Sequence, residues 1–172
     1  MRNESKFKGE LSEAAFLLQA LLAGFVVAKP HGDNARYDFI VDNGKRLIKV
    51  QVKSTSRLVS QSRYAVTIGR HYHGVPVPYG LSEVDFLAIH VVPHDCWYIM
   101  PLAATNGKTM IYLRGHRGGP NDRFATFLGA WDLLQDQERQ PDWSLDLNAA
   151  QPGGWRSVLN RWIEPLLRSP LG

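Results

Sequence analysis

The 172-residue sequence has little of several features that define large protein classes. Cys96 is its single cysteine, which excludes an intrachain disulfide and a multi-cysteine zinc site built from this chain alone. No segment approaches the roughly 18 consecutive apolar residues of a membrane span. The start, MRNESKFKGE, lacks the apolar core of a secretion signal. These absences favour a cytoplasmic protein that does not associate with membranes.

Acidic residues are missing from one long stretch of the chain. From Asn43 through Ser82 there is no aspartate or glutamate, although the whole sequence has 16 acidic residues against 20 Lys plus Arg and a net charge of +4. The basic residues of this stretch are Lys45, Arg46, Lys49, Lys53, Arg57, Arg63 and Arg70. A block of one sign that includes predicted strands indicates a polyanionic partner such as DNA. Charge alone fits equally well a solvated face balanced by acids from elsewhere in the fold.

The periodicity of the chain predicts a single folded domain over 1–172 with one helix, a run of strands and terminal helices. A helix is expected over 10–23, where Ala, Leu, Glu and Gln are frequent and Gly24 follows as a terminator. Strands are expected at 25–28, on both sides of Asn43-Gly44 within 37–54, and at 63–70, 84–92, 96–102 and 109–114. Helices are expected at 124–137 and 155–167. This order predicts an α/β (α+β) fold with a mixed central sheet, a core over about 8–115, and a C-terminal helical extension over 116–172 for oligomerisation or DNA contact.

The segment LIKVQVKSTS, residues 47–56, alternates in the manner of a strand and gathers its polar residues on one face. Lys49, Gln51 and Lys53 point one way. If Asn43 and Gly44 are the two central residues of the turn, Asp38 faces Lys49, and Gln51 is the diagonal neighbour of Asp38 on the same face. Diagonal neighbours lie roughly 7 to 8 Å apart, which lets two oxygen-bearing side chains converge on one small ion.

Such a face has the chemistry of a phosphodiesterase site. Mg²⁺ prefers oxygen ligands, so the Asp38 carboxylate and the Gln51 amide oxygen are suitable donors. Lys53 would orient or help deprotonate the attacking water and stabilise charge on the phosphate. Taken by themselves, the same residues are more often the solvated face of a surface strand.

The segment KGELSEAAFLLQALLAGFVVAKPHGDNARYDFIVDNGKRLIKVQVKS resembles the PD-(D/E)xK nuclease superfamily. It is most similar to the branch of group I intron homing endonucleases, with archaeal Holliday junction resolvases as more distant relatives. The resemblance implies a restriction-endonuclease-like fold and Mg²⁺-dependent hydrolysis of DNA, with Mn²⁺ as a substitute ion. Gln51 stands where an acid is usual, a variant that occurs in the homing-endonuclease branch, and Tyr37 stands where a proline is usual.

The resemblance also implies roles for individual residues. Glu13 joins Asp38 and Gln51 as a metal ligand, with Glu10 as the alternative helix acid, and Lys53 completes the catalytic set. Charge and loop position, rather than the resemblance, indicate the residues expected to contact DNA, which are Arg36, Lys49, Arg57, Arg63, Arg70, His71 and His73. His71 and His73 could also pair on a transition metal, but no third ligand has a clear spacing.

Two functions from different classes remain open. The first is an endonuclease that acts as a homodimer or homotetramer, because a small subunit with one site cuts one strand. The second is a nucleic-acid-binding module of the same fold whose catalytic site has decayed, with Gln51 as the sign of that decay.

Overall fold

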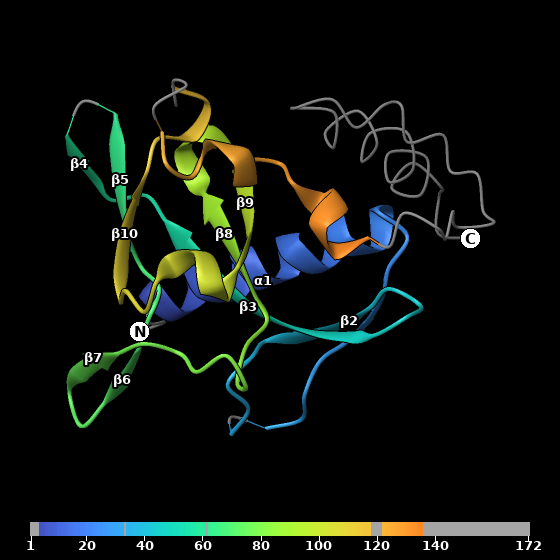
Figure 1. Ribbon diagram of the computed structural model, residues 1–172. Coiled ribbons are helices and arrows are strands. Elements are labelled where there is room, and N and C mark those ends of the chain that lie inside the picture. The colour runs from blue at the N-terminus through green and yellow to red at the C-terminus, as the bar shows by residue number, and fades with distance from the viewer. Residues whose placement is uncertain (1–3, 33, 61, 118–121, 136–172) are drawn as a thin grey trace, which may run out of the picture. The chain divides into compact units, whose positions relative to one another are not determined.

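The computed structural model describes residues 4–32, 34–60, 62–117 and 122–135, which all fall within one compact unit, residues 1–140. One long helix, α1 (Glu4–Leu22), packs against a five-stranded sheet (Figure 1). In spatial order this sheet consists of β1 (Val26–Ala28), β2 (Phe39–Asp42), β3 (Leu47–Thr55), β8 (Phe86–Val91) and β9 (Cys96–Pro101). β3 and β8 are parallel, whereas the other neighbours are antiparallel. The predicted α+β fold with a mixed central sheet is therefore confirmed.

A second sheet and a two-stranded ribbon complete the strands of the described residues. The second sheet has the order β10 (Met110–Leu113), β5 (Arg63–Thr67) and β4 (Leu58–Ser60), and the ribbon pairs β6 (Arg70–Tyr72) with β7 (Val75–Val77). The single strand expected over 63–70 is thus divided. The backbone N–H groups of Ile68 and Gly69 both donate to the Thr109 carbonyl, which ends β5 and turns the chain into β6.

Apolar side chains cover both faces of the central sheet, which fixes its position between α1 and the second sheet. On one face, Phe16 and Ala20 of α1 are buried against Phe39 and Ile48. The opposite face is covered by the second sheet and by loops, in a core cluster that includes Tyr64, Val66, Leu87, Ile89, Tyr98, Met100 and Leu113. β8 is buried along its whole length because both of its faces are covered.

The turn between β2 and β3 differs from the predicted two-residue turn. Ile40 pairs with Lys49 and Asp42 with Leu47, so the loop has four residues, 43–46. Local hydrogen bonds explain this loop, because the Asn43 side-chain oxygen accepts from the N–H groups of Lys45 and Arg46. The register moves by two residues, which keeps every side chain on its predicted face. Continued by one residue beyond β2, it sets Asp38 directly opposite Gln51 rather than diagonal to it.

Within the described residues, short 3₁₀ helices follow β8 and, further along the chain, β9. They are η1 (Val92–His94), η2 (Leu102–Thr105), η3 (Gly115–Arg117), η4 (Ala125–Phe127) and η5 (Trp131–Leu134). The predicted helix over 124–137 is wrong for its described part, which is divided at Gly129. This glycine has a positive φ of 67°, and its N–H donates to the Trp97 carbonyl, so the segment follows the edge of β9.

Two further expectations concern the C-terminal helix and membrane-spanning helices. The predicted helix at 155–167 lies outside the described residues, so the helical extension over 116–172 stays a prediction. Among the helices of the described residues, none is long and apolar enough to cross a membrane.

Candidate active site

A cavity of about 260 Å³ lies between the first half of α1 and the second half of β3. Its lining residues are Gly9, Ser12, Glu13, Asp38, Gln51, Val52, Lys53 and Ser54. The structure therefore brings the four predicted catalytic residues to one cavity, although they come from three separate segments. Glu10 is exposed and does not line the cavity, so the helix contributes Glu13 to this site.

The packing of α1 determines the position of Glu13. Ser12, Phe16 and Ala20 are buried on one side of the helix, at the spacing of an apolar stripe. The ring of Phe16 contacts those of Phe39 and Trp131, with ring centroids 5.3 and 5.7 Å apart. Glu13 precedes Phe16 by three residues, so it lies near the same side of the helix. The buried aromatic contacts thus hold the Glu13 carboxylate beside the sheet.

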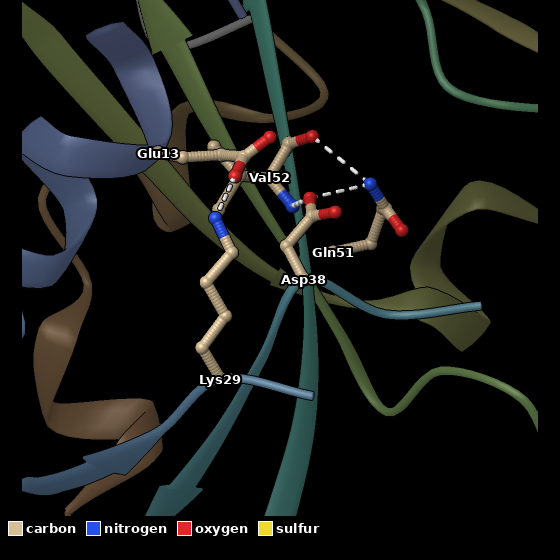
Figure 2. Close-up of polar contacts among 5 residues, drawn as sticks. All are labelled: Glu13, Lys29, Asp38, Gln51 and Val52. Carbon is tan, nitrogen blue, oxygen red and sulfur yellow. Dashed lines mark hydrogen bonds and ion pairs between the residues drawn. The ribbon is translucent and has the colours of Figure 1, made fainter. Parts of the chain in front are cut away.

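Asp38 lies immediately before β2, and its backbone and carboxylate extend the hydrogen bonding between β2 and β3 by one more pair of bonds. The Asp38 N–H donates to the Val50 carbonyl, and the Val52 N–H donates back to Oδ2 of Asp38 at 2.7 Å. The same Oδ2 accepts from Nε2 of Gln51, which also donates to the Val52 carbonyl (Figure 2). Gln51 is 9% exposed. Asp38 and Gln51 are consequently held together in a shielded position.

Burial raises the pKa of the Asp38 carboxyl above its ordinary value. The hydrogen bond from Val52 opposes this rise, while the charge of Glu13 adds to it. Two carboxylates thus act on each other across the cavity. A cation between them would relieve this repulsion, which is the condition expected at a site that binds a divalent ion.

Lys29, which follows β1, is a residue of this site that the sequence did not identify. Its Nζ lies 2.7 Å from Oε2 of Glu13 (Figure 2). The hydrogen bond from Lys29 to Glu13 is the largest cause of a raised Lys29 pKa, and the charges of Asp38 and Glu10 contribute to it. The sequence carries no direct signal for this contact, because it depends on the pairing of β1 with β2 and on the packing of α1.

Lys53 points from β3 toward a residue of a distant loop. Its Nζ donates to the Tyr79 hydroxyl at 3.2 Å and lies 5.4 Å from the centre of the Tyr79 ring. Tyr79 belongs to the loop between β7 and β8, and the periodicity of the sequence gives no indication of this contact. The tyrosine restricts the rotamers of the lysine while leaving its ammonium at the cavity wall.

The residues predicted to contact DNA lie outside the cavity lining. Arg57 and Arg63 are exposed at the hairpin of β4 and β5, and Arg70, His71 and His73 belong to the ribbon of β6 and β7 (Figure 1). Lys49 donates through Nζ to the Ser82 carbonyl. Arg36 and Arg70 lie 3.8 and 3.9 Å from the carboxylate oxygens of Glu83. Glu83 directly follows the acid-free stretch and balances part of its charge, an interaction that the charge pattern alone did not reveal.

The donors of the cavity suit a hard divalent cation better than a transition metal. Within the described ranges, no group of three or more His, Cys, Asp or Glu side chains could hold a metal ion. Asp38 and Glu13 offer two carboxylates, and Gln51 offers an amide oxygen if its side chain turns. Mg²⁺ accepts such a set because it needs only one or two carboxylates and keeps several waters. His71 and His73 gain no third ligand from the described chain.

The site combines an acid at the start of one strand, a Gln and a Lys two residues apart on the next strand, and a helix carboxylate beside them. On a mixed sheet, this combination is typical of one class of nucleases. Residues 3–132 match the family model described as PD-(D/E)XK endonuclease. Because this match covers more than half of the chain, the protein belongs to the PD-(D/E)XK endonuclease family. The resemblance drawn from the sequence is confirmed.

Solved structures of this fold include two that are similar to the chain. A bacterial homing endonuclease, I-Ssp6803I, is 27% identical with a TM-score of 0.69, and the alignment covers 79% of this chain and 96% of that one. The Holliday junction resolvase Hjc of Archaeoglobus fulgidus, an archaeal hyperthermophile, is 14% identical with a TM-score of 0.48, covering 74% and 95%. A comparison with curated proteins gave no match. The likeness to the homing endonuclease confirms the predicted restriction-endonuclease-like core.

Proposed function

We propose that this chain is a divalent-metal-dependent endonuclease that hydrolyses phosphodiester bonds of DNA, with a homing-endonuclease-like or resolvase-like activity. The observation that carries the proposal is the convergence of Glu13, Asp38, Gln51 and Lys53 on one cavity. Family membership supports the nuclease class, and the carboxylate pair supports the need for a cation. Mg²⁺ is the proposed ion, and Mn²⁺ is expected to substitute because it also favours carboxylate and carbonyl oxygens.

Each residue of the cavity has a distinct proposed role. Asp38 and Glu13 would hold the ion through their carboxylates, and Gln51 would add its amide oxygen after a rotation that breaks the hydrogen bond to Asp38. When bound, the ion offsets negative charge on the phosphate and lowers the pKa of a water ligand. Lys53 carries the positive charge that stabilises the phosphate as the new bond forms, and Tyr79 keeps its ammonium in position.

Basic residues outside the cavity, exposed except for the half-buried Lys49 and Arg70, form the proposed DNA-binding surface. They are Arg36, Lys49, Arg57, Arg63, Arg70, His71 and His73. Contacts to phosphates hold a duplex in register without reading its sequence, which suits side chains that are exposed and held by few internal bonds. A β-ribbon such as β6–β7 has dimensions that a major groove accepts.

The cleavage of both strands requires more than one cavity. Because each chain has one set of catalytic residues, we propose a symmetric homodimer or homotetramer acting on DNA in the cytoplasm. The nuclease domain is proposed to extend over 1–172, with residues 116–172 serving oligomerisation or DNA contact.

One observation favours a second function, a DNA-binding module without catalysis. The Gln51 amide nitrogen, rather than its oxygen, faces Asp38, and Lys29 neutralises Glu13. Both contacts satisfy the cavity internally without an ion.

Cleavage of supercoiled plasmid and of branched DNA, with Mg²⁺ or Mn²⁺, separates the two functions. The endonuclease proposal expects nicking by the wild-type protein and its loss, by at least about 10²-fold, in Asp38→Asn and Lys53→Met. Asp132→Asn and Lys108→Met are matched controls, because they remove the same charges at exposed positions outside the cavity. Binding of DNA without cleavage of any substrate would establish the second function, and activity that survives both cavity substitutions would place the site elsewhere.

A further inference from the structure

Lys29 is bound to a residue that the proposed metal site needs. Its ammonium lies 2.7 Å from Oε2 of Glu13, and the two side chains are 60% and 26% exposed. The side chain extends from the end of β1 and also passes over the ring of Phe39, with Nζ 5.5 Å from the ring centre. The Lys29 side chain approaches the cavity from outside, whereas Asp38 and Gln51 form the shielded wall of the cavity.

The ion pair contributes little to the stability of the fold. Exposed pairs of this kind gain little free energy in water, since solvent screens them and the side chains lose rotamer freedom. The position of the pair is nevertheless specific, because Glu13 and Asp38 repel each other across the cavity. Lys29 places a positive charge in the field of both carboxylates, and Glu10 adds to that field. The ammonium therefore supplies the compensation that a divalent ion would otherwise supply.

We propose that Lys29 is a competing counter-ion that occupies the cation position at Glu13 in the metal-free protein and must leave it when a divalent ion binds. Lys29 thus sets the metal concentration at which the cavity fills, and it is a positioning residue that acts through Glu13. The inference rests on the proposed function, because Glu13 is a metal ligand there. The exposure of the lysine allows its displacement, since the released ammonium can turn into solvent without unpacking the core.

Calorimetric titration with Mg²⁺, without DNA, tests the competition directly. Lys29→Met keeps the length of the side chain and removes its charge, so it is expected to bind Mg²⁺ about two- to fivefold more tightly than wild type. Lys8→Met is the matched control. Lys8 is also 60% exposed and forms an ion pair of 2.7 Å, but with Glu4, which does not line the cavity. The Lys8→Met variant should bind Mg²⁺ with the same affinity as wild type.

A double-mutant cycle distinguishes competition at Glu13 from a general effect of charge. In the Glu13→Gln background, the ammonium has lost its partner carboxylate and acts only through the weaker fields of Asp38 and Glu10, so Lys29→Met should raise Mg²⁺ affinity much less than in wild type. In the protein with Glu13 intact, Lys29→Arg keeps the positive charge and should therefore bind Mg²⁺ with wild-type affinity. An equal gain from Lys29→Met with and without Glu13 would overturn the proposal, as would wild-type affinity in Lys29→Met itself.

NMR of the Lys29 side chain gives a readout that a merely structural role would not move. Addition of Mg²⁺ should shift the Lys29 Cε–Hε resonance toward the position of a free lysine, while that of Lys8 stays constant. A Lys29 signal that stays unchanged as the site saturates would contradict displacement. Asp38→Asn separates the two proposals: if this variant binds Mg²⁺ like wild type, the proposed metal site fails. If it loses binding while Lys29→Met matches wild type, only the counter-ion inference fails.

Discussion

The candidate cavity and the basic hairpins hold their charges in opposite ways. The basic hairpins are β4–β5, with Arg57 and Arg63, and β6–β7, with Arg70, His71 and His73. In the cavity, Asp38 accepts hydrogen bonds from the Val52 backbone and the Gln51 side chain, and its charge is partly desolvated. On the hairpins the charged side chains are mostly exposed, and Arg63 donates to the hydroxyl of the neighbouring Ser60 and lies over the ring of Tyr112.

This difference separates the two tasks of a nuclease. Chemistry needs groups fixed to within a fraction of an ångström, which buried backbone and core packing provide. Binding to a long polyanion tolerates imprecise contacts, because the free energy comes mainly from counterion release. Substitutions in the cavity should therefore have steep, specific effects, whereas those on the hairpins should be gradual and additive.

The largest effect is expected from the core that holds the helix glutamate. Phe16 is fully buried, so Phe16→Ala should lower the free energy of unfolding by about 3 to 5 kcal/mol. It should also weaken Mg²⁺ binding, because Glu13 shifts with the helix. Chemical denaturation and calorimetry measure the two effects. Leu18→Ala, at a 36% exposed position of the same helix, is the control and should change both only slightly. Equal losses in the two variants would mean that core packing does not position the site.

A strong but more local effect is expected from Gln51→Glu. The substitution places a carboxylate next to Asp38, in addition to that of Glu13, so Mg²⁺ affinity should rise about tenfold in titrations. The metal-free protein should become less stable, because the favourable contact between Gln51 and Asp38 becomes a repulsion. Unchanged metal dependence would return Gln51 to the role of a structural residue.

On the basic hairpins, the expected change is moderate and concerns salt. Arg57→Gln and Arg63→Gln should each reduce the slope of log DNA affinity against log salt by about one unit, if each side chain makes one phosphate contact. The double variant should lose about two units. Lys108→Gln is the control for a basic residue outside the hairpins. Slopes equal to that control would move the DNA-binding surface away from β4–β5.

The smallest effect concerns pH and follows from the raised pKa of Asp38. An acid with a raised pKa in the folded state destabilises the fold as the pH rises from its ordinary value of 3.8 through the raised value. Without metal, Asp38→Asn should therefore melt at a higher temperature than wild type at pH 7, and this advantage should disappear below about pH 3. Arg63→Gln should show no such pattern. A less stable Asp38→Asn at neutral pH would mean that the hydrogen bonds outweigh the burial of the charge.

Much of the cavity could be predicted because it depends on alternation along two adjacent strands. The faces of Asp38, Gln51 and Lys53 follow from a period of two, and they survive the error in the turn because the register moved by an even number of residues. That error came from the Asn43 side chain, which closes a four-residue loop with its own hydrogen bonds. Glu13 required the family resemblance, since a helix glutamate has no local signal for a site.

The contacts that were missed join segments far apart in the sequence. Lys29 meets Glu13 only through the packing of β1 against β2 and of α1 over the sheet, and Tyr79 meets Lys53 from a loop 26 residues away. The predicted helix over 124–137 failed at Gly129, where a backbone bond to Trp97 outweighed the local preference for a helix. Such contacts depend on tertiary structure, which local periodicity does not encode.

The central claim is that the cavity binds a divalent ion and positions a DNA phosphate beside Lys53. A crystal structure with Mn²⁺ and cleavable DNA, with anomalous scattering to locate the metal, tests it most directly. The claim predicts an anomalous peak within coordination distance of the Asp38 carboxylate, the scissile phosphate beside the Lys53 ammonium, and Lys29 turned away from Glu13. A peak absent from the cavity, with DNA bound at another surface, would contradict it.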